Sequence, residues 1–220
     1  MNSAAFEKLQ SQIERLQKEV IGSPVWIKNK HVFEYPAVDI KVVAILKAIR
    51  AVQGLKALHL LCANGLFIDM GAIFRCIMDC EYEIYFLLEK YPEQSENVTK
   101  FVTAFSQTTI VNHLAQSTVF PPSKKIYAAA ARVVSMSKQD QNTTDMLNRI
   151  YTTFCGYTHA NYSHIMQIYG GSNWKDVSFN IGGVPSDMQK MEHMQLVDEV
   201  VKSLSSLLKF MGLKFNVKLE

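Results

Sequence analysis

Two groups of polar side chains occur inside segments that are otherwise apolar. The first lies in residues 64–91, where Arg75 is followed four positions later by Asp79. Side chains four residues apart lie on one face of a helix, so the guanidinium and the carboxylate can pair. A third charge, Glu81, falls in the middle of the apolar face. Because a buried charge is costly unless it is paired, these residues form either a structural ion pair or part of a site.

The second group follows Asp145, in a segment rich in tyrosine and histidine. Histidine acts as a general base near neutral pH, tyrosine and asparagine donate hydrogen bonds to developing charge, and arginine binds phosphate or carboxylate. If the helix at 145–159 packs against the helix at 66–91, an Asp–His–Tyr arrangement beside an arginine follows. A buried hydrogen-bonded network that only fixes helix packing is the alternative. The candidate residues are Arg149, Tyr151, Cys155, Tyr157, His159, Asn161 and His164.

Other chemistries have weaker support in the sequence. His159 and His164 are five positions apart, which does not suit a zinc-binding pair on one helical face, and Cys76 and Cys80 share a face without a histidine motif. Cys155 and His159 are four apart, so a thiol nucleophile is an alternative, although no glycine-rich turn surrounds Cys155. The motifs of P-loop, dinucleotide-binding and serine hydrolase proteins are absent from the sequence. We therefore expect no metal and no cofactor.

The composition is typical of a globular protein. The chain has 220 residues, of which 48% are hydrophobic and 20% charged, and a formal net charge of +3, which neither implies nor excludes RNA as a partner. No stretch of the sequence is apolar enough to span a membrane, and its beginning lacks the apolar block of a signal peptide. The four cysteines lie in apolar helical segments, as expected for reduced thiols. These features predict a soluble, cytoplasmic protein without a membrane partner.

Hydrophobic periodicity predicts an all-α fold built on an antiparallel hairpin. Its first helix spans 37–63 and is opened by Pro36. Its second helix, at 66–91, carries two neighbouring apolar stripes and should be buried on most sides. Only Asn64 and Gly65 separate the two helices, which favours antiparallel packing. The other helices are expected at 4–20, 98–116, 124–136, at 145–159 with an open question whether it continues to Tyr169, and from Ser186–Asp187 to Lys209–Gly212.

These elements predict a single-domain helical bundle of about seven helices. Residues 1–22 form an amphipathic N-terminal arm with a coiled-coil-like seam, and the arm either packs on its own domain or pairs with a second copy. An irregular or extended segment follows, and residues 36–220 form the bundle. Within the bundle, the glycine-rich segment 169–186 is typical of a flap. Its alternating run from Val177 to Ile181 predicts a short strand or hairpin.

The hairpin resembles the core of an uncharacterised, mainly bacterial, all-helical family of unknown function. The resemblance rests on the run from Leu60, Leu-Leu-Cys-Ala-Asn-Gly-Leu-Phe-Ile-Asp-x5-Arg-x3-Asp. That family tends to carry an arginine followed four positions later by an acid, usually Glu where this chain has Asp79. It also tends to carry a later Tyr-x3-(Ser/Cys)-x-Tyr-x-His pattern. Here this pattern is matched by Tyr151, Cys155, Tyr157 and His159. The resemblance covers about residues 40–165.

More remotely, a helical bundle with arginine and histidine beside a partner helix is similar to HEPN-type domains. Many of these domains are metal-independent ribonucleases of toxin and phage-defence systems, and they work as dimers. Their motif is an arginine followed by a histidine after four to six residues, whereas Arg149 and His159 have nine residues between them. This resemblance implies a homodimer that acts on RNA.

Two functions follow from these residues, one of them catalytic. In the first, a HEPN-like homodimer cleaves RNA: His159 is the base for the 2′-hydroxyl, Arg75 or Arg149 stabilises phosphate charge, and Asp79 orients the arginine or the histidine. In the second, a non-catalytic interaction or ligand-sensing module of a defence or stress system, with an unidentified protein partner, uses the same residues in its core while the flap gates a small ligand. A solvent-open cleft at His159 and Arg75 favours the first, and a sealed core favours the second.

Overall fold

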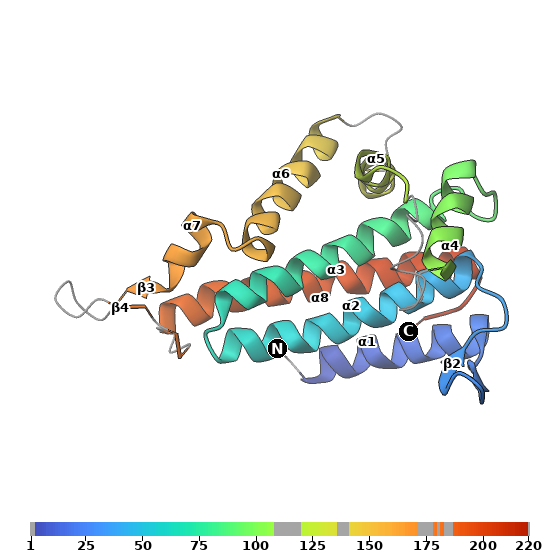
Figure 1. Cartoon of the computed structure of the whole chain (residues 1–220), viewed down its shortest axis with the longest axis horizontal. Coiled ribbons are helices and arrows are strands. Elements are labelled where there is room, and N and C mark those ends of the chain that lie inside the picture. The colour runs from blue at the N-terminus through green and yellow to red at the C-terminus, as the bar shows by residue number, and fades with distance from the viewer. Residues whose placement is uncertain are drawn as a thin grey trace.

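The computed structural model describes residues 3–107, 120–135, 141–170, 178–179, 181–182 and 187–219. They form an all-α bundle, which confirms the predicted fold class. Helices α2, α3 and α8 run side by side, with α1 along their edge (Figure 1). These four helices are α1 (Ser3–Leu16), α2 (Ile40–Ala63), α3 (Phe67–Leu88) and α8 (Asp187–Phe215). The shorter helices are α4 (Glu96–Gln107), α5 (Ser123–Ser135), α6 (Gln141–Thr158) and α7 (Tyr162–Ile165).

The first helix of the central hairpin begins at Ile40 because Asp39 caps it. The Oδ1 atom of Asp39 accepts hydrogen bonds from the backbone N–H groups of Lys41 at 2.9 Å and Val42 at 3.0 Å. These N–H groups have no partner inside the helix, so the aspartate stabilises this end. The prediction that Pro36 opens the helix is therefore wrong.

The second helix of the hairpin, α3, is the central element of the bundle. Fourteen of its 22 residues are buried, as its two apolar stripes predicted. It packs against α2 and α8 and also against α5 and α6, which lie on another side (Figure 1). The charged residues Arg75 and Glu81 are among the buried ones. Within the described part of the chain, no helix combines the length and the apolar character needed to cross a membrane.

The N-terminal helix packs on its own chain. Leu9, Ile13 and Leu16 are buried in the same core as α2 and α8. A short π-helical turn, Gln17–Ile21, continues the helix toward the first strand. Of the two arrangements that the sequence left open, packing within the chain therefore holds for this seam.

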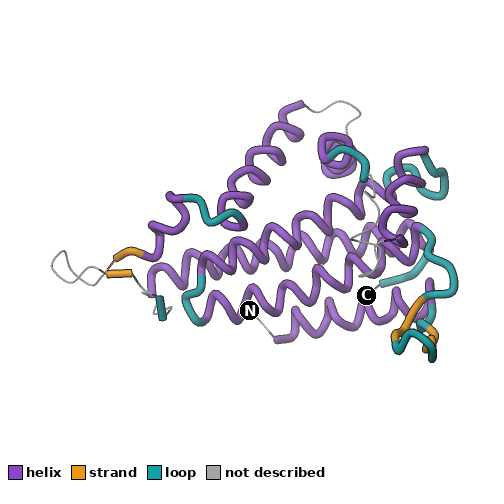
Figure 2. The backbone as a smooth tube through the Cα atoms, in the orientation of Figure 1, coloured by secondary structure: helices purple, strands orange, loops and turns teal. Residues whose placement is uncertain are grey.

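Two short antiparallel strand pairs lie at opposite ends of the bundle (Figure 2). At one end, β1 (Val25–Ile27) and β2 (Val32–Glu34) form a hairpin in the segment predicted to be irregular or extended. At the other end, β3 (Tyr169–Gly170) pairs with β4 (Ser178–Phe179) inside the predicted flap. Residues 171–177, 180 and 183–186 of the flap lie outside the described residues, as does the 108–116 part of the helix expected at 98–116.

Two helices end where a residue adopts a left-handed backbone conformation. Ala160, with φ 49°, follows the end of α6 at Thr158, so the helix does not continue to Tyr169. A 3-10 turn, Met166–Ile168, follows α7 instead. At the other terminus α8 continues to Phe215 and Asn216 has φ 57°. A left-handed residue commonly terminates a helix, so the prediction that α8 ends at Lys209–Gly212 is wrong.

Candidate functional site

Arg75 lies where α3 meets α6 and is contacted from both helices. Its guanidinium carbon lies 3.5 Å from the centre of the Tyr151 ring, and its Nε donates a hydrogen bond of 3.5 Å to the Cys155 Sγ. On α3 itself, Arg75 forms an ion pair with Asp79 one turn further along. Tyr151 and Cys155 are also one turn apart, so each helix contributes one pair. The structure thus brings together four of the residues that the sequence singled out.

The ion pair at this site is buried at one end and open to solvent at the other. Arg75 is 9% exposed, whereas the side chain of Asp79 is 40% exposed. Burial disfavours the charge of Arg75, but the hydrogen bonds with Asp79 and Cys155 outweigh it, so the pKa of Arg75 is raised. The guanidinium therefore remains a permanent cation inside the fold.

Three tyrosines surround this arginine. The Tyr127 ring lies 4.7 Å from the Tyr151 ring and 5.5 Å from the Tyr82 ring, measured between centroids. Burial raises the pKa of Tyr82, and it raises the pKa of Tyr127 together with a hydrogen bond to Tyr151. These two hydroxyls therefore stay protonated near neutral pH. Tyr127 was not among the residues predicted from the sequence, although it is the one aromatic residue of α5.

A cavity of about 210 Å³ opens beside Arg75, between α3, α5 and α6. Its lining is mostly polar, and each acid in it has a cationic partner. Asp79 pairs with Arg75, and Glu83 pairs with Lys47 of α2. The cavity can thus present hydrogen-bond donors and acceptors without a large net charge. It is lined by Arg75, Asp79, Tyr82, Glu83, Ser123, Ile126, Tyr127 and Tyr151.

His159, the residue expected to act as a base, lies outside this cavity. It is exposed beyond the end of α6, where its backbone N–H donates to the Cys155 carbonyl at 3.0 Å. Among the described residues it forms no hydrogen bond, ion pair or ring contact with Arg75. The left-handed turn at Ala160 ends α6 at Thr158, just before His159. The imidazole therefore does not lie on the helical face that carries Tyr151 and Cys155. Arg149 and Asn161 are likewise exposed and do not line the cavity.

His164, unlike His159, packs against α6. Its ring lies 4.2 Å from the Tyr157 ring, edge to face, and its Nδ1 lies 3.3 Å from the Ser163 hydroxyl. The Tyr157 hydroxyl donates to Gln167 Oε1 at 3.0 Å. These residues form a second polar network at the end of α6, and none of them lines the cavity beside Arg75.

Two glycines permit this packing because neighbouring rings occupy the space of a side chain. A Cβ atom at Gly71 of α3 would overlap the Tyr157 ring, and one at Gly156 of α6 would overlap the His164 ring. α3 and α6 can therefore approach each other only with glycine at position 71, and glycine at position 156 leaves room for the His164 ring of α7.

Glu81 lies apart from both networks, within the core, and is 7% exposed. Burial raises its pKa to about 7, against the opposing effect of a hydrogen bond with Ser203 of α8. Among the described residues, its Oε1 atom has no hydrogen-bond partner. Glu81 is therefore a proton-binding group of the core rather than a member of the Arg75 site.

Cys76 and Cys80 interact along the face of α3 that meets α2. A hydrogen bond with Cys80 lowers the pKa of the Cys76 thiol to about 6, with a smaller contribution from Arg50, and the same contact raises the pKa of Cys80. Within the described residues, no three His, Cys, Asp or Glu side chains are grouped so that they would hold a metal ion.

Comparisons with known proteins do not identify the chain. No family model matches it, and no curated protein or solved structure matches it. The functional inference therefore rests on the residues around Arg75.

Proposed function

We propose that this chain is a non-catalytic module that binds a small polar ligand in the cavity beside Arg75. The observation that supports this function is a cavity of about 210 Å³ walled by a nine-tenths buried arginine and three tyrosines. Asp79 and Tyr151 hold the guanidinium in one orientation, so little freedom is lost when a ligand binds. A concave site with a few convergent polar groups is typical of ligand recognition.

The lining favours a ligand that is zwitterionic or uncharged. Arg75 and Lys47 balance Asp79 and Glu83, so a ligand with one net charge would leave an uncompensated charge in the site. The tyrosine rings offer flat apolar surfaces, and the hydroxyls of Tyr82 and Tyr127 are protonated donors. Free amino acids and nucleosides combine a flat or apolar part with such polar groups.

RNA cleavage by a homodimer stays a prediction and is the second hypothesis. It requires a base beside the cation, and the exposed His159 has no contact with the buried Arg75 among the described residues. An assay of RNA cleavage that compares the parent protein with the His159→Ala variant decides this point. Cleavage by the parent that is lost in the variant would support the ribonuclease and count against a non-catalytic module.

The binding proposal is tested by thermal unfolding in the presence of free amino acids, nucleosides and monosaccharides. We expect members of one of these classes to raise the unfolding temperature of the parent, because a ligand that binds only the folded state stabilises it. The Tyr127→Phe variant removes one donor from the cavity and should lose about tenfold in affinity for the same ligand. Tyr162→Phe changes an exposed tyrosine outside the cavity and serves as the matched control. The absence of any stabilising compound would contradict the proposal.

A further inference from the structure

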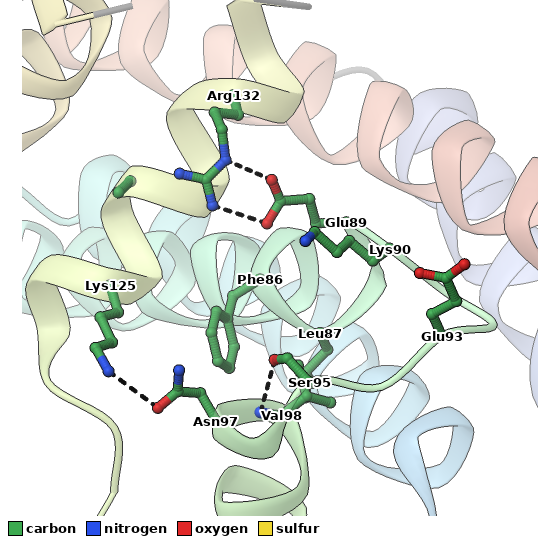
Figure 3. Close-up of a pocket in the computed structure, with 11 residues that line it drawn as sticks. Phe86, Leu87, Glu89, Lys90, Glu93, Ser95, Asn97, Val98, Lys125 and Arg132 are labelled. Carbon is green, nitrogen blue, oxygen red and sulfur yellow. Dashed lines mark hydrogen bonds and ion pairs between the residues drawn. The ribbon is translucent and has the colours of Figure 1, made fainter. Parts of the chain in front are cut away.

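A second cavity lies on the opposite face of α5. It measures about 280 Å³ and is enclosed by the end of α3, the beginning of α4 and α5 (Figure 3). From α5 it is lined by Lys125, Ala128 and Arg132, which are three and four residues apart and so share one helical face. The small Ala128 side chain lies between the two cations and leaves the hollow open. None of these residues lines the cavity beside Arg75.

The hollow has an apolar floor. Phe86 of α3 and Val98 of α4 line it and are both buried, and Figure 3 shows the Phe86 ring between the charged side chains. An apolar group laid against this floor would be removed from water, which is favourable in proportion to the area that it buries.

One cation of α5, Arg132, forms an ion pair with an acid. Arg132 donates to Glu89 through two hydrogen bonds, from Nε at 2.5 Å and from Nη2 at 2.9 Å (Figure 3). The main-chain carbonyl of Glu89 also accepts from Lys214 Nζ at 3.1 Å, which ties the pair to α8. This bidentate pair forms a fixed and neutral wall.

The other cation of α5, Lys125, has a neutral hydrogen-bond partner, and Glu96, which pairs with Lys100, attracts it without forming an ion pair. Lys125 Nζ donates to the amide oxygen of Asn97 at 3.2 Å, so the ammonium is held at the rim of the hollow (Figure 3). The ion pairs of the described residues include neither Lys125 nor Lys90, which also lines the cavity. Three cations therefore line the hollow against two acids, Glu89 and Glu93.

We propose that this second cavity binds a small organic anion whose carboxylate or phosphate group pairs with Lys125 and whose apolar stem lies on Phe86. The Ser95 hydroxyl and the Asn97 amide, which line the same side, supply further hydrogen bonds to the anionic group. This site is independent of the cavity beside Arg75, because α5 separates the two and they share no lining residue.

The test is isothermal titration calorimetry at low salt with phenyl phosphate and benzoate, and with inorganic phosphate and phenol as the two halves of the first probe. We expect phenyl phosphate to bind at least tenfold more tightly than either half, because both the floor and the cation contribute. Lys125→Gln should weaken phenyl phosphate binding by about tenfold, the usual effect of losing a charge-assisted hydrogen bond. Lys124→Gln removes an equal charge from the exposed neighbouring residue, which does not line the hollow, and should leave binding unchanged.

Ala128→Leu provides a second test, since the larger side chain fills the hollow and should abolish binding of phenyl phosphate. Tyr127→Phe, on the other face of α5, should leave that binding unchanged, so this site and the cavity beside Arg75 are judged separately. Three results would overturn the proposal. They are no binding of either anion to the parent at millimolar concentration, equal losses in Lys124→Gln and Lys125→Gln, and undiminished binding in Ala128→Leu.

Discussion

Arg75 contacts the Tyr151 ring, the Cys155 thiol and the Asp79 carboxylate. The contact with the ring depends on the planar shape of the guanidinium. The guanidinium stacks 3.5 Å from the Tyr151 centroid in a place that solvent hardly reaches. We therefore expect a coupling energy of about 1–2 kcal/mol in a double-mutant cycle of Arg75→Gln and Tyr151→Leu, measured by urea unfolding. Lys56 and Phe6 provide the control cycle. The Lys56 Nζ lies 6.0 Å from the centre of the Phe6 ring and the lysine is exposed, so this pair should couple more weakly. Equal coupling in the two cycles would contradict the stacking.

Glu81 makes the stability of the fold depend on pH. Its pKa is about 7 when folded and near 4.5 when unfolded, so the folded state binds the proton more tightly. The stability that this provides is complete below pH 4.5, decreases as the pH rises and is lost above pH 7. The free energy of unfolding of Glu81→Gln should therefore rise by about 3 kcal/mol relative to that of the parent as the pH increases from 4 to 8. Urea unfolding at pH 4, 6 and 8 measures this, with the exposed Glu199→Gln as control. A difference between parent and variant that stays constant with pH would exclude Glu81 as the buried proton site.

The packing of α3 against α6 depends on Gly71, where a Cβ atom would overlap the Tyr157 ring. Gly71→Ala should lower the free energy of unfolding by about 1–3 kcal/mol, as overpacking of a core usually does. In a Tyr157→Ala background the overlap is gone, so the same change should stabilise the helix by up to about 1 kcal/mol through its better helix propensity. Gly182→Ala, where a Cβ meets nothing within 4 Å, is the control. Chemical unfolding of the parent, the two single variants, the double variant and the control gives the comparison. If Gly71→Ala changed the free energy of unfolding with the same sign in both backgrounds, the overlap with Tyr157 would be ruled out.

The faces of helices were predictable from the sequence, whereas their ends and the contacts across the fold were not. The spacing of four residues placed Arg75 and Asp79 on one face of their helix, and the structure brings this pair together with Tyr151 and Cys155 of α6. His159 lies four positions after Cys155 but does not join the site, because α6 ends at the left-handed turn of Ala160, and this turn leaves no periodic signal in the sequence. In the same way, Pro36 predicted a beginning of α2 that is too early, because the cap that Asp39 forms is visible only in the geometry of the folded chain.

For the molecule as a whole, the cavity beside Arg75 could not be predicted because its third wall comes from α5. Tyr127 lies far in sequence from both Arg75 and Tyr151, and nothing in the local pattern of an alanine-rich helix indicates which partner it meets. The second cavity was not predicted for the same reason. In the sequence Lys125 and Arg132 look like ordinary surface cations, and only the fold brings Phe86 and Glu89 next to them. Sites formed by three separate helices require the tertiary arrangement.

The N-terminal helix is part of this arrangement, because Leu16 is completely buried in the core shared by α1, α2 and α8. Leu16→Ala should therefore lower the free energy of unfolding by about 2–5 kcal/mol, in a single transition with the rest of the bundle. Leu213→Ala, at an exposed position of α8, should change it by less than about 0.5 kcal/mol. Urea unfolding followed by circular dichroism distinguishes the two. If Leu16→Ala left the transition of the bundle unchanged and melted only the first helix, α1 would be an independent arm, and its buried seam would then be available to a second copy of the chain.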